Sequence, residues 1–381
     1  MKMMKRLNTE KLHALLTARN SDDIAAGRVG GSALCVYQDD QLCFKGFFGT
    51  VEPNGAPVTE DTIFRLASMT KPITAVAALI LCEEGKLDLN TPISRWLPDY
   101  AEQNIVEPDG AGVLRVVGRA KTAITPLHLL THTSGLGSGV VGEIQRAGET
   151  DAARGTLRGM ADFYADKGLA FEPFTTQMYS GVVAFSIMAR IIEMIAQQDY
   201  STFLQDRIFD PCGMVDTTFL PTDEQWARMI TIHNYRDGAA CVGWTEPGCV
   251  FERYPASSCL GGAGLISTLH DYSRFAEMLL NEGICGSTRV ISKEAHALLC
   301  RAHVPVSGKQ SWGLGVRVIT DEAYGQLPVG TYGWSGAYGT HFWVDPVNRI
   351  TAVYLKNSRY DGGAGCVTGV NFEKDVAAAL V

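Results

Sequence analysis

The sequence lacks long hydrophobic runs, since no stretch of 18 consecutive apolar residues occurs among its 381 residues. A membrane-spanning helix needs about 20 predominantly apolar residues, so we expect no membrane partner. The N-terminus is basic, but the apolar stretch of about 7–15 residues that is typical of a secretion signal does not follow it. We therefore expect a cytoplasmic protein.

Positive charge is also scarce. The chain carries 33 lysines and arginines against 41 aspartates and glutamates, a formal net charge of −8. No basic block or arginine-rich stretch is present that would favour binding to nucleic acid or to an anionic membrane surface. We expect neither of these partners, and the composition leaves the oligomeric state undetermined.

Cysteine spacing excludes a further group of functions. The ten cysteines include no C-x-x-C pair, so neither a zinc module nor a compact disulfide framework is indicated. Free thiols, several of them buried, in a reducing compartment are the expected state. The glycine-rich stretch Gly261–Gly264 lacks the G-x-G-x-x-G spacing of a nucleotide loop. We therefore expect no metal and no cofactor.

The remaining composition is that of a globular α/β protein, with 46% hydrophobic residues, 40 glycines and 15 prolines. Helices are predicted at residues 9–26, 126–130, 181–197, 269–280 and 372–381. Strands are predicted at residues 33–37, 42–48, 312–319, 330–335, 340–344 and 350–356. This order indicates one sheet built from both ends of the chain, with a mostly helical region inserted between them.

The stretch Ser68-Met69-Thr70-Lys71 carries the first chemical signal. On a helix, positions i and i+3 share one face, so the Ser68 hydroxyl and the Lys71 amine can meet. Serine needs a neighbouring base to act as a nucleophile, and lysine becomes that base only if burial lowers its pKa. The apolar run that begins after Pro72 can provide the burial. The alternative is a solvated Ser and Lys on an ordinary first turn, since about one such match is expected by chance.

Two further polar stretches follow. Tyr179 lies directly before a predicted buried helix, where it can relay a proton if a nearby lysine lowers its pKa, or simply anchor a loop with its ring. The segment 332–340 contains three glycines, which mark a close approach of another backbone or a ligand. We interpret this segment as an edge strand that can offer a backbone N–H to an oxyanion.

The stretch after the predicted helix 126–130 allows two interpretations. His132 can be a catalytic base and Ser134 a nucleophile, or His132 can lie at a helix C-terminus that Gly135 caps, and we favour the second. Residues 136–170 are rich in glycine and charge, which is typical of a surface excursion or a lid.

In this order, the motifs resemble those of the serine β-lactamase and penicillin-binding-protein superfamily, whose signature is S-x-x-K, then S-D-N or its counterpart, then K-T-G. The similarity is closest to the class C β-lactamase-like branch, which includes the family VIII carboxylesterases. The matching stretches, which span nearly the whole chain, are Ser68–Lys71, Leu129–Leu136, Tyr179–Gly181, Gly261–Leu269 and Trp334–Gly336.

The resemblance implies an α/β, β-lactamase-like fold, in which an antiparallel sheet flanked by terminal helices (residues 1–65 and 305–381) meets a mostly helical domain (residues 66–304) at the active site. It implies Ser68 as the acylated nucleophile, with Lys71 and Tyr179 handling protons. It places the N–H groups of Ser68 and Ala337 in the oxyanion hole. Its K-T-G position corresponds to the substrate-binding residues Trp334, Ser335 and Gly336.

Two departures from the family pattern bear on the substrate. Gly181 stands where β-lactamases carry an asparagine side chain, and Trp334 replaces the lysine of K-T-G. A wide, aromatic-lined pocket without that cation suits a neutral ester better than a penicillin. We therefore predict a carboxylesterase for short acyl chains. The alternatives are an acyltransferase or transesterase, a weak β-lactam hydrolase, and a binding homologue without catalytic activity.

Overall fold

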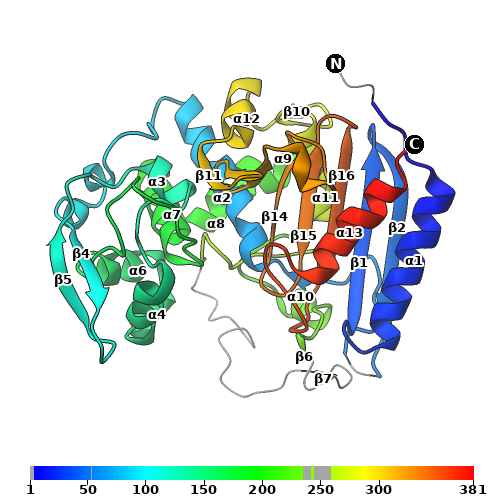
Figure 1. Cartoon of the computed structure of the whole chain (residues 1–381), viewed down its shortest axis with the longest axis horizontal. Coiled ribbons are helices and arrows are strands. Elements are labelled where there is room, and N and C mark those ends of the chain that lie inside the picture. The colour runs from blue at the N-terminus through cyan, green and yellow to red at the C-terminus, as the bar shows by residue number, and fades with distance from the viewer. Residues whose placement is uncertain (1–3, 53, 235–241, 244–258) are drawn as a thin grey trace.

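The computed structural model describes residues 4–52, 54–234, 242–243 and 259–381. An eight-stranded antiparallel sheet with a helix layer on each face occupies one side of the molecule, and a mostly helical region occupies the other (Figure 1). The predicted fold class is therefore confirmed. In spatial order the strands are β11 (Val304–Ser307), β12 (Gln310–Trp312), β13 (Arg317–Ile319), β14 (Tyr332–Ser335), β15 (His341–Asp345), β16 (Ile350–Lys356), β1 (Gly31–Gln38) and β2 (Gln41–Gly49).

The N-terminal hairpin joins the two ends of the chain. Asp39 and Asp40 both have positive φ, 49° and 61°, which is the conformation that a two-residue hairpin turn needs to match the strand twist. On its other edge β1 pairs with β16, from Ser32 opposite Lys356 to Gln38 opposite Ile350. The sheet is thus complete only when the first 50 residues meet the last 80.

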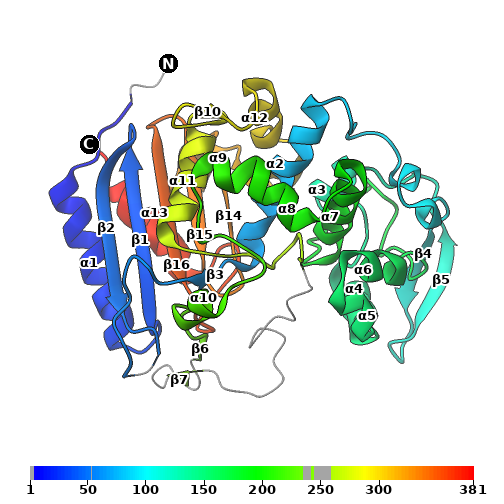
Figure 2. The same ribbon diagram turned by 180° about the vertical axis from the view of Figure 1, so that it is seen from behind.

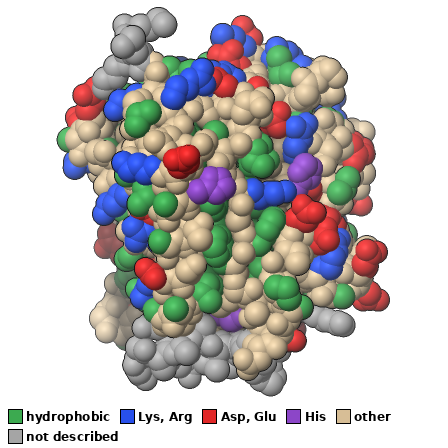
Figure 3. Space-filling model, turned by 90° about the vertical axis from the view of Figure 1, so that its right-hand side faces the viewer, with side chains coloured by type: hydrophobic (Ala, Val, Ile, Leu, Met, Phe, Trp, Pro, Cys, Tyr) green, Lys and Arg blue, Asp and Glu red, His purple; other side chains and the backbone are tan. Residues whose placement is uncertain are grey.

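Terminal helices cover one face of this sheet. Helices α1 (Thr9–Ala25) and α13 (Val367–Ala378) lie side by side there in both views (Figures 1 and 2). Their apolar side chains, including Leu16 and Phe372, form a core with the residues of β1, β15 and β16 that face these helices, such as Trp343. The outer surface beside α1 and β2 intermixes acidic and basic side chains (Figure 3).

The opposite face packs against α11 (Leu269–Leu280) and the larger core. At its centre is α2 (Thr70–Glu83), whose residues Thr70 to Leu81 are all buried, and which packs against α7 (Val183–Ala196). The other helices are α3 (Pro126–Leu130), α4 (Gly139–Ala147), α5 (Asp151–Gly155), α6 (Leu157–Tyr164), α8 (Tyr200–Leu204), α9 (Asp210–Cys212), α10 (Asp223–Ala227) and α12 (Lys293–Cys300). Short strand pairs are β3 (Phe64–Arg65) with β8 (Ile266–Ser267), β4 (Asn104–Pro108) with β5 (Leu114–Arg119), β6 (His233–Asn234) with β7 (Val242–Gly243), and β9 (Ile284–Cys285) with β10 (Thr288–Arg289).

Several predicted elements need correction. The strand predicted at 312–319 is two strands, because the chain leaves the sheet between Trp312 and Arg317. Strand β14 lies inside the sheet between β13 and β15, so its interpretation as an edge strand is wrong. The closing helix begins at Val367, five residues before the predicted start. The hairpin of β4 and β5 and the edge strand β11 were not predicted.

Residues 136–170 form three helices rather than a loose excursion. Side chains of α6, including Leu157, Met160 and Tyr164, are buried in the main core. The segment therefore belongs to the packed helical region, with α4 beside the site described below.

Eight cysteines lie within the described residues and all are free; Cys35, Cys212, Cys285 and Cys366 are buried. Cys241 and Cys249 fall outside those residues. In the part of the chain that the structure describes, no helix has the length and apolarity needed to cross a membrane.

Candidate active site

Ser68 sits on a constrained turn between a strand and a helix. Strand β3 leads into a 3-10 turn over Ala67–Met69, and α2 begins at Thr70. Ala67 has φ +48°, the left-handed region, which costs a residue other than glycine roughly 1–2 kcal/mol. The Thr70 hydroxyl holds the turn by donating to the Ala67 carbonyl (2.8 Å) and accepting from the Leu265 N–H (3.2 Å). Such maintained backbone strain is typical of functional sites.

Lys71 is buried beside Ser68. Its Nζ lies 3.2 Å from Ser68 Oγ, 2.6 Å from the Gly181 carbonyl and 2.7 Å from the Gly262 carbonyl. Burial lowers the pKa of Lys71, although Tyr179 opposes the shift. A neutral amine has two N–H groups and one lone pair. If the two N–H groups donate to the two carbonyls, the lone pair faces the Ser68 hydroxyl. In its neutral form this lysine can accept a proton from the Ser68 hydroxyl.

Tyr179 reaches Ser68 from the segment that precedes α7, which begins at Val183. Its hydroxyl donates to Ser68 Oγ at 2.7 Å, and its ring centroid lies 4.9 Å from Lys71 Nζ. The ring packs against the rings of His132 and Trp334, at centroid distances of 4.6 and 5.5 Å. Lys71 and Tyr179 thus both contact Ser68 Oγ, so the three side chains that are expected to act together form one cluster.

His132 supports Tyr179 and does not contact Ser68. Helix α3 ends at Leu130 with Thr131 as its C-cap, and His132 adopts the left-handed conformation (φ +58°), so the prediction that Gly135 caps the helix is wrong. Its Nδ1 accepts from the Ser180 N–H at 3.1 Å, which leaves the proton on Nε2. Burial and the nearby Lys71 lower the pKa of His132 well below its usual value, so the ring is neutral. Ser134 is buried and accepts from the Leu136 N–H, away from this cluster.

The loop after β14 brings Ala337 to the cavity that Ser68 lines. The Gly336 N–H donates to the Thr340 carbonyl at 2.7 Å, and the Thr340 hydroxyl donates to the Leu66 carbonyl at 2.9 Å. A side chain at Gly336 would place its Cβ 2.3 Å from the Leu66 carbonyl oxygen, so only glycine allows this approach. No described residue accepts a hydrogen bond from the Ala337 N–H. Ala337 and Ser68 line the same cavity, as an oxyanion site requires.

This cavity has a volume of about 530 Å³, within the range of ligand sites. It is lined by Ala67, Ser68, Arg146, Tyr179, Gly181, Val182, Ala263, Ala337, Tyr338, Arg359, Asp361 and Gly362. The sequence predicts an aromatic-lined pocket without the cation of the K-T-G lysine. Two tyrosines are among the lining residues, but so are two arginines and an aspartate, so the cavity is not lined mainly by aromatic rings and contains cations from other segments.

The three residues at the K-T-G position do not line the cavity. Trp334 is buried against the rings of Tyr179 and Trp312. Ser335 is buried and shares a hydrogen bond of 2.8 Å with His341 Nδ1. Gly336 provides the close approach to Leu66. These residues pack against residues of the site, but none of the three lines the cavity in which a substrate would bind.

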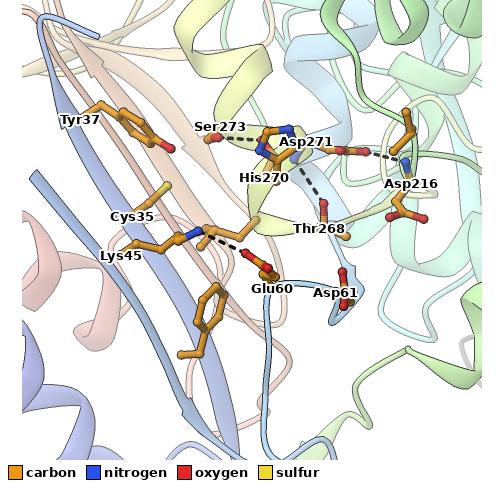
Figure 4. A pocket seen from close by; sticks show the side chains of 13 residues that line it. Cys35, Tyr37, Lys45, Glu60, Asp61, Asp216, Thr268, His270, Asp271 and Ser273 are labelled. Atoms are coloured by element: carbon orange, nitrogen blue, oxygen red, sulfur yellow. Dashed lines mark hydrogen bonds and ion pairs between the residues drawn. The ribbon is translucent and has the colours of Figure 1, made fainter. Parts of the chain in front are cut away.

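A second cavity, of about 240 Å³, lies between β1, β2 and the start of α11 (Figure 4). Its possible nucleophile is Cys35, but burial raises the pKa of this thiol to about 12, so it stays protonated at neutral pH. Asp271 accepts from the Asp216 N–H and the Thr217 hydroxyl rather than orienting a base. At the Ser68 cavity, in contrast, a serine hydroxyl lies in contact with a buried amine.

Several contributors to the site carry no signal in the sequence. Gly181 and Gly262 act through backbone carbonyls, which any residue possesses. Arg146 and Arg359 reach the cavity from segments with no recognisable spacing to Ser68. Among the described residues, no group of three His, Cys, Asp or Glu side chains is placed to hold a metal ion.

The chain is similar to known proteins over nearly its whole length. The family model "Beta-lactamase" matches residues 14–371. Protein Rv1367c of Mycobacterium tuberculosis is 33% identical over 353 residues, covering 87% of this chain and 86% of the relative. Esterase EstB of Burkholderia gladioli is 29% identical over 395 residues, covering 95% and 94%.

Among solved structures, EstCE1, a hydrolase with promiscuous acyltransferase activity, superposes with a TM-score of 0.81 at 23% identity, covering 97% of this chain and 98% of that one. The likeness at this identity concerns the fold. Because the family model spans nearly all of the sequence, this chain belongs to the beta-lactamase family.

Proposed function

We propose that this protein is a serine esterase that hydrolyses short-chain carboxylic esters through an acyl-enzyme on Ser68. The observation that carries the proposal is the placement of Ser68 Oγ, 3.2 Å from a buried lysine Nζ and 2.7 Å from the Tyr179 hydroxyl. The relative named Esterase EstB, similar over nearly its whole length, supports an ester as the substrate.

The reaction follows from these positions. Ser68 Oγ bonds to the ester carbonyl carbon while its proton passes to the neutral Lys71. The N–H groups of Ser68 and Ala337 stabilise the oxyanion, and each such donor is typically worth ~10²–10³ in turnover. The ester C–O bond then breaks as the leaving alkoxide takes the Tyr179 proton, which Lys71 replaces. Water attacks the acyl-enzyme by the reverse proton path and releases the acid.

Transfer of the acyl group to an alcohol is a second candidate. The cavity of about 530 Å³ is larger than a short acyl chain fills, so an alcohol can occupy the remainder beside the acyl-enzyme. An added alcohol acceptor would then yield a new ester in competition with hydrolysis, which product analysis by gas chromatography measures.

The test combines labelling with substrate comparison. A fluorophosphonate probe should add one adduct to the intact mass, and the Ser68→Ala variant should add none. The wild-type protein should hydrolyse 4-nitrophenyl butyrate much faster than a chromogenic cephalosporin. Faster cephalosporin turnover would make the protein a β-lactam hydrolase, and absence of any adduct would indicate a binding protein without catalysis.

A further inference from the structure

The cavity around Ser68 contains positive charge that the reaction does not use. Arg146, on α4, and Arg359, after β16, both line it. The single carboxylate among the described lining residues is Asp361, and it is already engaged by the fully buried Lys356 and by the Thr368 N–H and hydroxyl. Burial disfavours the charge on Asp361, but these partners outweigh burial and hold its pKa below the usual range. These partners therefore occupy Asp361, and it forms no ion pair with Arg146.

Arg146 is available to a ligand. It is exposed and forms no ion pair with any described residue. The acidic neighbour one turn along, Glu149, accepts from the Tyr164 hydroxyl at 2.7 Å and pairs with Arg154. In a chain of net charge −8, this cavity is thus a local positive site beside the nucleophile.

A guanidinium recognises a carboxylate through two parallel N–H donors, so it suits an acid better than a neutral chain. This inference rests on the proposed esterase function. We propose that the preferred substrates are esters that also carry an ionised carboxylate, and that Arg146 binds this carboxylate. The absence of a lysine at position 334 then does not remove anion binding, because the cation comes instead from α4, in the segment 136–170.

The test compares matched esters. For 4-nitrophenyl hydrogen adipate against 4-nitrophenyl hexanoate, wild-type kcat/KM should favour the adipate by ~5- to 20-fold, as expected for a charge-assisted hydrogen bond at a partly solvated site. Arg146→Gln should bring this ratio close to unity. Arg158→Gln, which removes an exposed charge on α6 outside the cavity, is the matched control and should keep the ratio. The ratio should also fall as salt is raised.

The side of the ester that carries the acid is a separate arm. 3-Carboxy-4-nitrophenyl butyrate places the carboxylate on the leaving group, so its sensitivity to Arg146→Gln, compared with that of the adipate, assigns Arg146 to the alcohol or the acyl end. The proposal would be overturned if wild-type kcat/KM for both acid-bearing esters were no higher than for their neutral counterparts. An equal change of this kcat/KM ratio in Arg146→Gln and Arg158→Gln would also overturn it.

A binding measurement separates this inference from the esterase proposal. Calorimetry with 5-oxohexanoate and 2-heptanone, ketones of similar length that cannot be hydrolysed, needs no turnover. Tighter binding of the keto acid that is lost in Arg146→Gln supports the anion site even if both esters remain intact. Equal affinities in the wild-type protein would refute it, whatever the esterase activity.

Discussion

Replacing Tyr179 by phenylalanine isolates one atom of the site. The ring, which packs against His132 and Trp334, is kept, and only the hydroxyl 2.7 Å from Ser68 Oγ is removed. If that hydroxyl only donates a hydrogen bond, its loss costs about 0.5–1.5 kcal/mol, equivalent to ~2- to 12-fold in rate. If it gives its proton to the leaving group, the loss should reach ~10²–10⁴-fold.

The leaving group distinguishes the two roles further. Departing 4-nitrophenolate needs little protonation, whereas ethoxide cannot leave without a proton. We therefore expect kcat/KM of Tyr179→Phe to fall far more for ethyl butyrate, followed by pH-stat titration, than for 4-nitrophenyl butyrate, followed by absorbance. The thermal unfolding midpoint should stay close to that of the wild-type protein, because the apolar packing is unchanged.

An equal loss for both esters, or a loss below about tenfold for ethyl butyrate, would refute the assignment of Tyr179 as the proton donor. The hydroxyl would then serve only to orient Ser68, and the leaving group would take its proton from another group.

Other predictions concern the groups around this contact. Burial lowers the pKa of Lys71, and the neutral amine is the proposed base, so kcat/KM should rise with pH through that lowered pKa, below the ~10.4 of free lysine. Lys71→Arg, which stays charged, should lose ~10³ or more in kcat/KM at every pH, and an active arginine variant would contradict the role of Lys71 as the base. His132→Asn, which retains an acceptor for the Ser180 N–H, should keep more activity than His132→Leu at a similar unfolding midpoint; equal losses would exclude the positioning role. Glu373→Leu should lower the free energy of unfolding in urea by ~3–5 kcal/mol, because it leaves the buried Arg317 unpaired. Glu102→Leu, at an exposed ion pair, should lower it by under about 1 kcal/mol, and equal effects of the two substitutions would contradict the stabilising role of the buried pair.

The parts of the fold that the sequence predicts best are those with a local pattern. Helix α7 and the hairpin of β1 and β2 follow from apolar periodicity and a two-residue turn. The hairpin of β4 and β5 has no such pattern, because Val113, Val116 and Val117 are exposed and do not alternate with buried positions. The position of β14 inside the sheet depends on pairing across the chain, which no local pattern encodes.

The same distinction applies to the site. Ser68 and Lys71 are readable because one helical turn relates them. Tyr179 is placed by resemblance, since nothing local ties it to a serine more than 100 residues earlier. The carbonyl of Gly262 and the guanidinium of Arg146 could not be predicted, because a backbone atom has no sequence signature and an arginine is usually a solvated charge.

The proposed reaction depends on a contact between the helical region and the sheet. Ser68 and its proposed base Lys71 belong to α2 and the turn before it, in the helical region, whereas Ala337 lies in the loop that follows β14 of the sheet. One hydroxyl, that of Thr340, ties the Ala337 loop to the carbonyl of Leu66, two residues before the nucleophile. Gly336 leaves no space for a side chain at this junction, so backbone packing fixes the distance between Ser68 and the Ala337 N–H. The proposed oxyanion hole therefore forms only when the sheet is packed against α2 as it is in this structure.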